Sequence, residues 1–226
     1  MRVTSSQTIY ERIKDDIIYL RRKPGEELNI QALSDEMSVS RSPVRDALML
    51  LQSEALVNMY PQRGCWVSLI DLNRVNEERL LRLSLEKCVL EHLENKLKPS
   101  DIARIEYFIA LQKEAVETDD SKGFYGSDDD MHHVYFKAAG LDSFWSLWMR
   151  ETGNYRRIRL LSVDTAGSSD KSIEQHEAIL DAFKRNDFND ALKTITEHIM
   201  KLNYEKDAIV KLHPDYFIEG ENETDK

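Results

Sequence analysis

The order of apolar spacings in the first 70 residues constrains the fold more than any other feature of this sequence. Three stretches carry apolar residues at three- and four-residue spacing, which predicts three amphipathic helices, the first over residues 7–20. Their apolar faces are Ile9, Ile13, Ile17 and Leu20, then Leu33 and Met37, then Val44, Leu48 and Leu51. Two short strands are predicted over residues 56–69, around a turn at Pro61–Gly64. Helices followed by a β-hairpin in this order predict a winged helix–turn–helix.

From Asp71 onward the spacing is helical almost throughout. The predicted helices are 72–97, 100–118, 124–139, 142–162, 171–186 and 188–210. The fold class is therefore mostly α, with a winged helix–turn–helix and its small β-hairpin in residues 1–70 and an all-α bundle of six or seven helices in residues 71–226. Only 8 glycines and 5 prolines among 226 residues argue against an all-β fold. The acidic tail after Pro214 is predicted to be a frayed end.

The net charge of −10 is spread unevenly along the chain. Taken whole, it argues against a nucleic-acid partner, because proteins that bind DNA usually present a basic surface. Residues 1–70 hold nine basic and nine acidic side chains, so the whole acidic excess belongs to residues 71–226. The first region is therefore a neutral domain with a few arginines, and the average charge conceals that signal.

Membrane and secreted proteins are excluded by simple patterns. No apolar run is long enough to span a bilayer, and the N-terminus lacks the apolar segment of a secretory signal, so a cytoplasmic protein with no membrane partner is expected. Cys65 and Cys88 stand 23 residues apart without CxxC spacing. In a reducing compartment they are expected to be free thiols.

The start of the third predicted helix carries the candidate DNA-reading side chains. With its apolar face turned inward, Arg41 and Arg45 lie four residues apart on the outward face, beside Ser42. A recognition helix presents its N-terminal residues to base edges, and arginine bonds guanine or phosphate. Arg63, at the hairpin tip, is in reach of the DNA backbone or the minor groove. The alternative is that Arg41 and Arg45 pair with nearby acids on a solvated face.

The amino-acid sequence of this region resembles that of the GntR family of bacterial transcription regulators. The resemblance rests on Leu33-Ser-Asp-Glu-Met-Ser-Val-Ser-Arg-Ser-Pro-Val-Arg-Asp-Ala-Leu48 and on Arg63-Gly64 in the hairpin. It implies that Arg41, Ser42, Arg45 and Gly64 touch the double-stranded DNA of an operator. Gln31 departs from the pattern, since some members carry a basic DNA-contacting residue there.

Four further residues have the types and spacing of metal ligands. Asp128 and His132 are four apart in a predicted helix, so both project from one face and suit a single ion. His176 and His198 lie on two other predicted helices, and such a ligand set suits Zn²⁺, Ni²⁺ or a similar divalent ion. The alternative is that the acidic residues favour a helix N-terminus and that the histidines serve packing.

The second region is similar to the FadR-type effector domain of these regulators, the FCD domain, over about residues 72–210. The matching segments are Arg82-Leu-Ser-Leu-Glu86, Asp128-x-x-Met-His132, Glu174-Gln-His176 and the stretch that ends at His198. The resemblance implies that one aspartate and three histidines, Asp128, His132, His176 and His198, hold a divalent metal, with zinc or nickel the first candidates. It also implies that the metal helps to hold the carboxylate of a small organic acid.

Three arginines are the candidate effector-binding residues. Arg82 matches a family position where an arginine faces the effector, and Arg156 and Arg159 are further candidates, because a guanidinium suits carboxylate recognition. The alternative for Arg82 is an ion pair with Glu86, four residues on, on the surface of a helix. Aromatic residues nearby are expected in the core, namely Phe144, Trp145, Trp148 and Tyr155.

The expected function is a homodimeric transcription regulator, with repression the expected sign. A small organic acid would bind the C-terminal domain and change the affinity for the operator. An enzyme is not expected, since the sequence has no HExxH, glycine-rich phosphate loop or nucleophile elbow. The alternatives are a metal-dependent enzyme that acts on a small carboxylate in the same cavity, and an interaction module without salt-dependent DNA binding.

Overall fold

The computed structural model describes residues 6–94, 96–162 and 167–218. The chain divides into two compact units, each made of segments that are distant in sequence. The N-terminal unit comprises Met1–Val75, Gly153–Arg157 and Val210–Lys226. The helical unit comprises Asn76–Thr152 and Ile158–Ile209.

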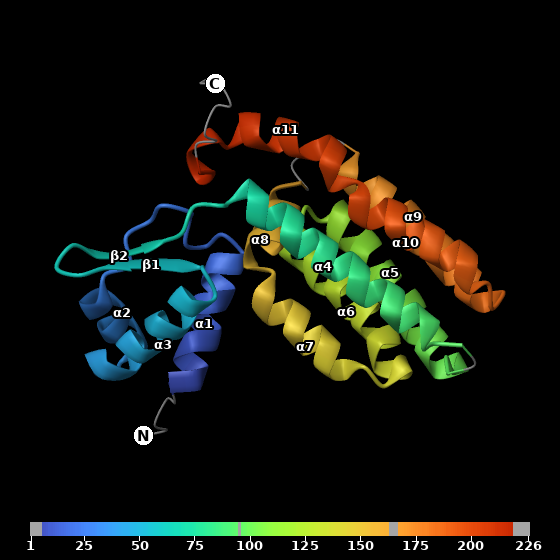
Figure 1. Ribbon diagram of the computed structural model, residues 1–226, viewed down its shortest axis with the longest axis horizontal. Helices are drawn as coiled ribbons and strands as arrows, with labels where there is room; N and C mark the ends of the chain where they lie inside the picture. The colour runs from blue at the N-terminus through green and yellow to red at the C-terminus, as the bar shows by residue number, and fades with distance from the viewer. Residues whose placement is uncertain (1–5, 95, 163–166, 219–226) are drawn as a thin grey trace, which may run out of the picture. The chain divides into compact units, whose positions relative to one another are not determined.

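The N-terminal unit has the predicted winged helix–turn–helix (Figure 1). Its elements are α1 (Ser6–Ile18), α2 (Ile30–Met37), α3 (Arg41–Ser53), β1 (Val57–Tyr60) and β2 (Gly64–Val67). The two strands form an antiparallel hairpin in which Val57 faces Val67 and Tyr60 faces Gly64. The order of apolar spacings thus predicted all five elements.

The core of this unit is formed by apolar side chains from the helices and the hairpin. The buried residues of α1 pack with those of α2, α3 and the hairpin; they are Ile9, Ile13, Ile17 and Ile18. Asn29 caps α2, since its side chain accepts a hydrogen bond from Ala32 N at 3.0 Å. Gly64 has φ +129, a conformation that favours glycine, and a Cβ there would lie 2.9 Å from the Trp66 ring.

Two later segments of the chain complete the N-terminal unit. Ile70 pairs with Phe217, and Ile218 N donates to Ile70 O at 3.0 Å. The fully buried Arg157 donates to Ser68 O at 2.6 Å. The expectation of a frayed end after Pro214 is therefore wrong as far as residue 218, because Phe217 buries its ring and the backbone finds partners; residues 219–226 lie outside the described part.

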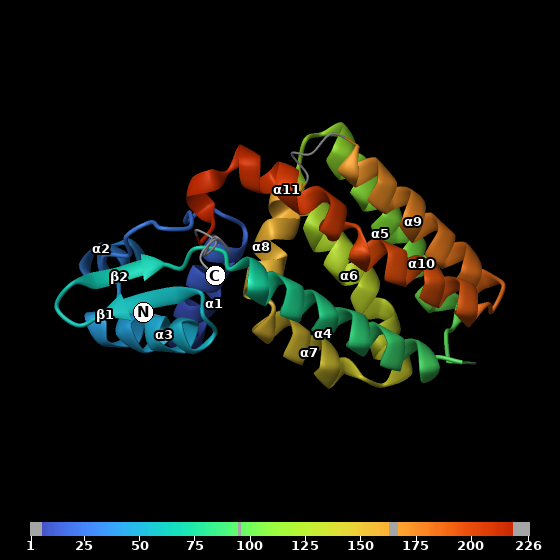
Figure 2. The same ribbon diagram turned by 45° about the horizontal axis from the view of Figure 1, so that its top comes forward.

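Helices α4 to α11 form an all-α bundle, as predicted, in which α5 packs on α6 and on α9, and α9 packs on α10 (Figure 2). Their bounds are α4 (Leu72–Glu91), α5 (Pro99–Glu117), α6 (Ser121–Ala139), α7 (Asp142–Glu151), α8 (Gly153–Ser162), α9 (Ser168–Lys184), α10 (Phe188–Met200) and α11 (Leu202–Leu212). The described residues thus contain eight α-helices after the hairpin rather than six or seven, followed by a 3-10 helix at Pro214–Tyr216.

The additional helices arise because two predicted helices are interrupted. Helix 142–162 breaks at Thr152, which leaves helical geometry at ψ 40. At the next residue a Cβ would lie 2.5 Å from Leu56, so the close approach needs Gly153. Helix 188–210 breaks at Lys201, whose N–H bonds His198 O three residues back. The three- and four-residue spacing of the apolar residues continues across both interruptions. The spacing therefore predicts one long helix in each case.

The two cysteines are free thiols, as expected. Cys65 is buried in the N-terminal unit, and burial raises its pKa to about 11. In the described part of the chain, no helix is both long and apolar enough to cross a membrane.

Candidate nucleic-acid interface and metal centre

Helix α3 turns its apolar side to the core and its arginines outward. Val44 and Leu48 are fully buried, whereas Arg41, Ser42 and Arg45 are exposed. Ser40 stands at the N-cap position in an extended conformation, and Pro43 follows in the first turn, where its missing N–H is no loss. The predicted DNA-reading side chains therefore share one exposed helix start.

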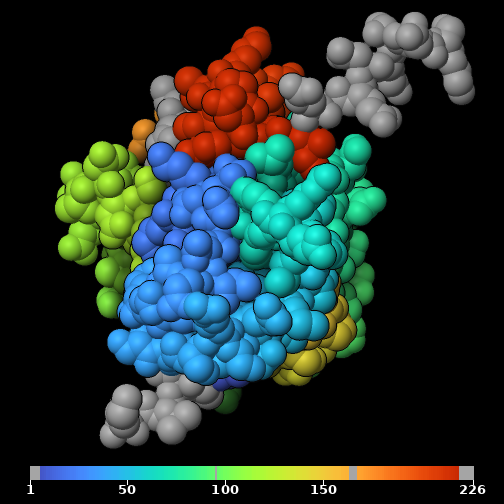
Figure 3. Space-filling view, turned by 90° about the vertical axis from the view of Figure 1, so that its left-hand side faces the viewer, coloured from blue at the N-terminus to red at the C-terminus, as the bar shows by residue number. Residues whose placement is uncertain are grey.

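The hairpin lies beside this helix and encloses a groove with it. Arg63 and Gly64 are exposed at the hairpin tip, as predicted. The groove has a volume of about 770 Å³, and its lining includes Gln31, Arg41, Arg45 and Gly64. Figure 3 shows the face of the molecule on which these elements lie, with α2 and α3 in lighter blue and the hairpin in cyan.

The arginines of this face differ from others in the unit by their partners. Arg41 donates its Nε–H to the amide oxygen of Gln31, and the side chains of Arg45 and Arg63 have no hydrogen bond or ion pair among the described residues. Arg21 and Arg22, by contrast, are ion-paired with acids. Arg2 lies outside the described residues. Cations without acidic partners remain available for an external anion.

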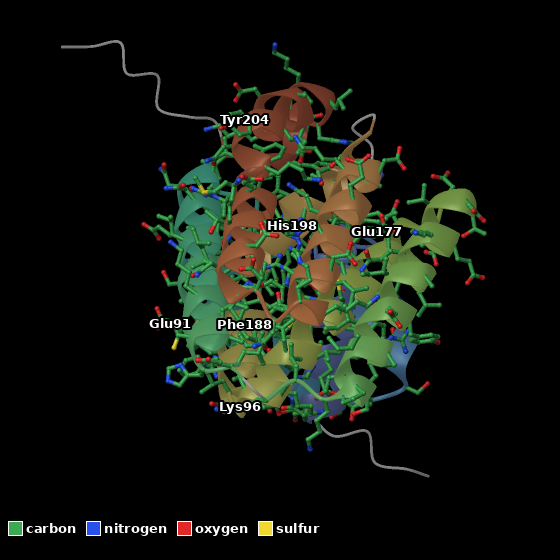
Figure 4. The ribbon with its side chains drawn as sticks, turned by 90° about the vertical axis from the view of Figure 1, so that its right-hand side faces the viewer. Glu91, Lys96, Glu177, Phe188, His198 and Tyr204 are labelled. Carbon is green, nitrogen blue, oxygen red and sulfur yellow. The ribbon has the colours of Figure 1, made fainter. Side chains whose placement is uncertain are left out.

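The four predicted metal ligands converge in the helical unit. Asp128, His132, His176 and His198 are all buried, and one ligand atom of each lies within 4.8 Å of the others. Asp128 and His132 stand one turn apart in the middle of α6, while His176 comes from α9 and His198 from α10. Figure 4 shows His198 among the helices, whereas Tyr204 lies on the outside. The acidic run does not mark a helix N-terminus, because α6 begins at Ser121.

Each histidine has its Nδ1 atom next to an oxygen acceptor. His176 Nδ1 lies 2.6 Å from Gln112 Oε1, and His198 Nδ1 lies 3.1 Å from Gln175 Oε1. His132 Nδ1 lies 3.0 Å from Glu86 Oε1. A carboxylate only accepts, and an amide oxygen only accepts, so Nδ1 carries the proton and the Nε2 lone pair is left for a ligand role.

The Nε2 atoms are the ones that gather at the centre. His176 Nε2 lies 3.3 Å from Asp128 Oδ1 and 3.4 Å from His198 Nε2. His132 Nε2 is buried and has no hydrogen-bond partner among the described residues. A buried nitrogen without a partner is costly unless something else binds it, and a divalent cation would do so. The donor set therefore fits a metal such as zinc or nickel.

The charges of the cluster are those that a cation requires. Burial lowers the pKa of His176 to about 3 and lowers the pKa of His198 well below its usual value, so both rings are neutral at pH 7. Burial alone would raise the pKa of Asp128, but Arg159, His176 and His132 hold it well below its usual range. Two neutral imidazoles, those of His176 and His198, and one carboxylate are thus present together.

Two of the three candidate effector-binding arginines reach Asp128. Arg159 bonds Asp128 Oδ2 directly and donates to Asp129 Oδ1 at 3.0 Å. Arg82 Nη2 lies 3.9 Å from Asp128 Oδ2. Arg156 is also buried, but it belongs to the N-terminal unit. The arginines are not spread over a surface; Arg82 is only 1% exposed.

Arg82 pairs with Glu86, as the alternative predicts, but the pair does not lie on a helix surface. Its Nε–H donates to Glu86 Oε1 at 3.1 Å, and both side chains are buried instead of lying on the surface. Burial alone would raise the pKa of Glu86, but His132, Arg82 and Tyr135 hold it at about 2. Spacing along one helix cannot distinguish a surface pair from a buried one, because both need the same four-residue step.

Three residues that support the histidines were not foreseen. Gln112, Gln175 and Tyr135 contact them, with Tyr135 bonding both His132 and Glu86. Gln175 precedes His176 in the sequence, and Tyr135 follows His132 by three, so position was a weak signal for these two. Gln112 comes from α5, which carries no motif.

The expected core aromatics are mostly buried, and one of them also touches the arginines. Trp145, Trp148 and Tyr155 are buried, while Phe144 is only partly so. The Arg82 guanidinium lies over the Trp148 ring at 5.0 Å from its centroid, and that of Arg159 lies 5.9 Å away. Such cation–π contacts hold both cations without consuming their donors.

Comparison with known proteins finds matches for both the N-terminal region and the helical region. Residues 79–201 match the FCD domain, and residues 5–67 match the bacterial regulatory proteins of the gntR family. The HTH-type transcriptional repressor RspR of Escherichia coli (strain K12) is 25% identical over 214 residues, which cover 95% of this chain and 94% of that protein. The gluconate operon transcriptional repressor of Bacillus licheniformis is 22% identical over 179 residues, covering 77% and 73%. The E. coli McbR/YncC structure shares the fold at a TM-score of 0.78 and 18% identity, covering 92% of this chain and 98% of that one.

Proposed function

Because this chain belongs to the GntR family of bacterial transcription regulators and carries an FCD domain, it is a DNA-binding regulator, and we propose that a divalent metal and a small organic acid control it. The observation that carries the proposal is the convergence of three histidine Nε2 atoms on Asp128 beside two buried arginines. Membership of this family gives no support to the alternative that the cluster is an enzyme's active site.

The DNA contacts are proposed to come from α3 and the hairpin. Arg41, Ser42 and Arg45 enter the major groove, and Arg45 is the side chain with the most freedom to bond a guanine. Arg63 and Gly64 at the hairpin tip contact the backbone or the minor groove. Residues 1–70 carry no net positive charge, so we expect one copy to bind weakly.

A homodimer that joins two half-sites would supply the missing affinity. We assign dimerisation to the region after residue 70, and we expect the cytoplasm, where operator DNA is found, as the location. If residues 1–70 alone bound the operator as tightly as the full chain does, this division of labour would be wrong.

Asp128, His132, His176 and His198 would hold the metal. The ion would supply positive charge and an open coordination position for the oxygen of an anionic ligand. Arg82 and Arg159 stand beside Asp128 as cations suited to a carboxylate, and Arg156 is a third candidate. The name of the gluconate operon repressor, a relative, fits an effector of the sugar-acid type.

Binding of the acid would alter the affinity for the operator by favouring one of two states. Helix α8 carries both Arg159, which bonds Asp128, and Arg157, which bonds Ser68. The two arginines of this one helix thus belong to different units. We propose that the acid-free form represses; two relatives are named as repressors.

An electrophoretic shift of DNA from upstream of the gene, titrated at several salt concentrations, tests the DNA-binding part. We expect a shift that weakens steeply with salt, because phosphate contacts release counterions. Screening organic acids by thermal shift, with and without chelator, tests the effector. The expected result is a rise in melting temperature for an acid only when metal is present, by linkage.

Metal analysis of the purified protein tests the ligand assignment. The wild type should carry about one divalent ion per chain, and the His132→Ala/His176→Ala double variant should lose it. Equal, substoichiometric metal in both proteins would mean that the histidines are structural.

A further inference from the structure

The three histidines of the metal cluster are supported by unlike partners. His176 and His198 face the neutral amide oxygens of Gln112 and Gln175. His132 faces the carboxylate of Glu86, which comes from α4 and is fully buried. No ligand role falls to Glu86 in the family assignment above, yet it contacts His132 and Arg82 directly.

Glu86 divides its two oxygens among three groups. Its Oε1 accepts from Arg82 Nε at 3.1 Å and lies 3.0 Å from His132 Nδ1. Its Oε2 accepts from the hydroxyl of Tyr135, which in turn contacts His132. One carboxylate oxygen is therefore shared between a metal-ligand histidine and an arginine that reaches toward Asp128.

We propose that Glu86 is the positioning residue that sets the metal affinity of the cluster through His132, and that Arg82 draws on the same carboxylate oxygen and so weakens its hold on His132. The inference rests on the proposed metal site. A carboxylate behind a ligating histidine fixes the ring and makes Nε2 a stronger donor to the metal than an amide does.

Arg82 opposes this effect in two ways. Its Nε–H takes part of the charge of Glu86 Oε1, and its Nη2, 3.9 Å from Asp128 Oδ2, adds a positive charge next to another ligand. A cation close to a metal ligand disfavours the binding of a second cation. An anionic effector that engaged Arg82 would relieve this opposition, and metal and effector would then strengthen each other's binding reciprocally.

The test is Glu86→Gln, measured by competition for Zn²⁺ between the full-length protein and a chromophoric chelator. Glutamine keeps the shape and the acceptor oxygen but removes the charge, so His132 would be supported as His176 and His198 are. We expect zinc affinity to fall about 10- to 100-fold, the usual cost of losing such a partner. The matched control is Glu177→Gln, an exposed carboxylate on α9 next to His176, which should leave zinc affinity unchanged.

A second variant gives a result that a structural role would not. Arg82→Gln removes the competing cation, so zinc should bind more tightly than to the wild type. A general disruption of the buried network would weaken zinc binding in both variants, and that outcome would overturn the proposal. If Glu86→Gln fails to fold, the neutral pair Arg82→Gln/Glu86→Gln replaces it, and its zinc affinity should fall below that of Arg82→Gln alone.

Two readouts separate the positioning role from stability. Melting temperatures in chelator report the fold, and the two-bond ¹H–¹⁵N spectrum of the histidines reports whether His132 keeps its proton on Nδ1. Wild type that binds no zinc would refute the proposed metal site itself. Wild type that binds zinc together with a Glu86→Gln variant of equal affinity would refute only the role of Glu86.

Discussion

Residues 6–70 and the helical unit differ in whether their charged side chains are exposed or buried. In the first region the buried polar side chains are Ser34 and Ser68 alone, and the arginines of α3 and the hairpin face solvent. The helical unit buries charged side chains in number: Glu78, Arg79, Arg82, Glu86, Asp128, Asp129 and Arg159. The same residue types therefore serve an external partner in one region and an internal network in the other.

This difference indicates in which region the binding residues also stabilise the fold. Exposed arginines can be changed with little effect on folding, because they remain hydrated. Buried charges need partners, and a missing partner leaves an uncompensated charge in a medium that solvates it poorly. Loss of a ligand residue should therefore damage the helical unit itself, and loss of a DNA-contacting residue should not damage the N-terminal unit.

The largest expected effect is that of Asp128→Ala. The change removes the buried ion pair of Arg159 with Asp128 and one of the two carboxylates beside Arg82, so the free energy of unfolding should fall by about 3–5 kcal/mol. Urea denaturation of the metal-free protein measures it. The control is Asp142→Ala, an exposed carboxylate at the start of α7, which should change stability little. Equal stability of the wild type and Asp128→Ala would erase the contrast between the two regions.

Arg45→Ala comes next, and it should act on DNA alone. Each half-site should lose about 1–3 kcal/mol of binding free energy if the guanidinium bonds a guanine, while melting stays as in the wild type. An operator shift at stated salt and a thermal melt give the two numbers. Arg12→Ala is the matched control, since this exposed arginine is ion-paired with Glu36 and does not line the groove. Wild-type operator affinity in the Arg45 variant would contradict its assignment.

A smaller effect is expected for Gln31→Ala. Gln31 accepts the Nε–H of Arg41 and also donates to Asp35 at 2.7 Å, so it holds the guanidinium in one orientation. Its loss should cost about 0.5–1.5 kcal/mol of operator affinity, the net value of one hydrogen bond, without a change in stability. Arg41→Ala in the same background should then show non-additive loss. Additive losses would mean that the two side chains act on DNA independently.

The smallest effect concerns the two thiols. Cys88, half-buried in the helical unit, should react first with a thiol reagent at pH 7, and Cys65 should react only as the protein unfolds. Burial raises the pKa of Cys65 from 9.0 to about 11. Its contribution to stability is therefore full below pH 9 and is lost as the pH rises toward 11. Equal labelling rates for both cysteines in the native protein would contradict the burial of Cys65.

Periodicity predicted the elements of the N-terminal unit well because each apolar face there meets a single core. Ile9, Ile13 and Ile17 are all fully buried, and the hairpin turns at the proline–glycine segment that was expected. The interruptions at Thr152 and Lys201 could not be predicted in the same way. They depend on contacts with distant residues, such as the close approach of Gly153 to Leu56, and not on the local pattern.

The candidate metal ligands were named from the sequence by resemblance, and spacing alone left them undecided. Asp128 and His132 share one helix face at any depth, so only packing shows that they are buried next to His176 and His198. The glutamines that contact the histidines could not be predicted from the sequence, because such glutamines have no characteristic spacing and Gln112 lies on a different helix from any metal ligand. Residues that orient ligands are recognised by contact and seldom by motif.

The pairing of Ile70 with Phe217 has a practical consequence for exchanging parts between regulators. A chimera joined at residue 70 would take the DNA-reading half without Arg157, which bonds Ser68, and without the chain end that covers Ile70. The transplanted half would expose an apolar strand edge to its new host. Biosensors built from this protein should therefore carry the last segment together with the first, and a purification tag is better fused beyond residue 218 than put in place of it.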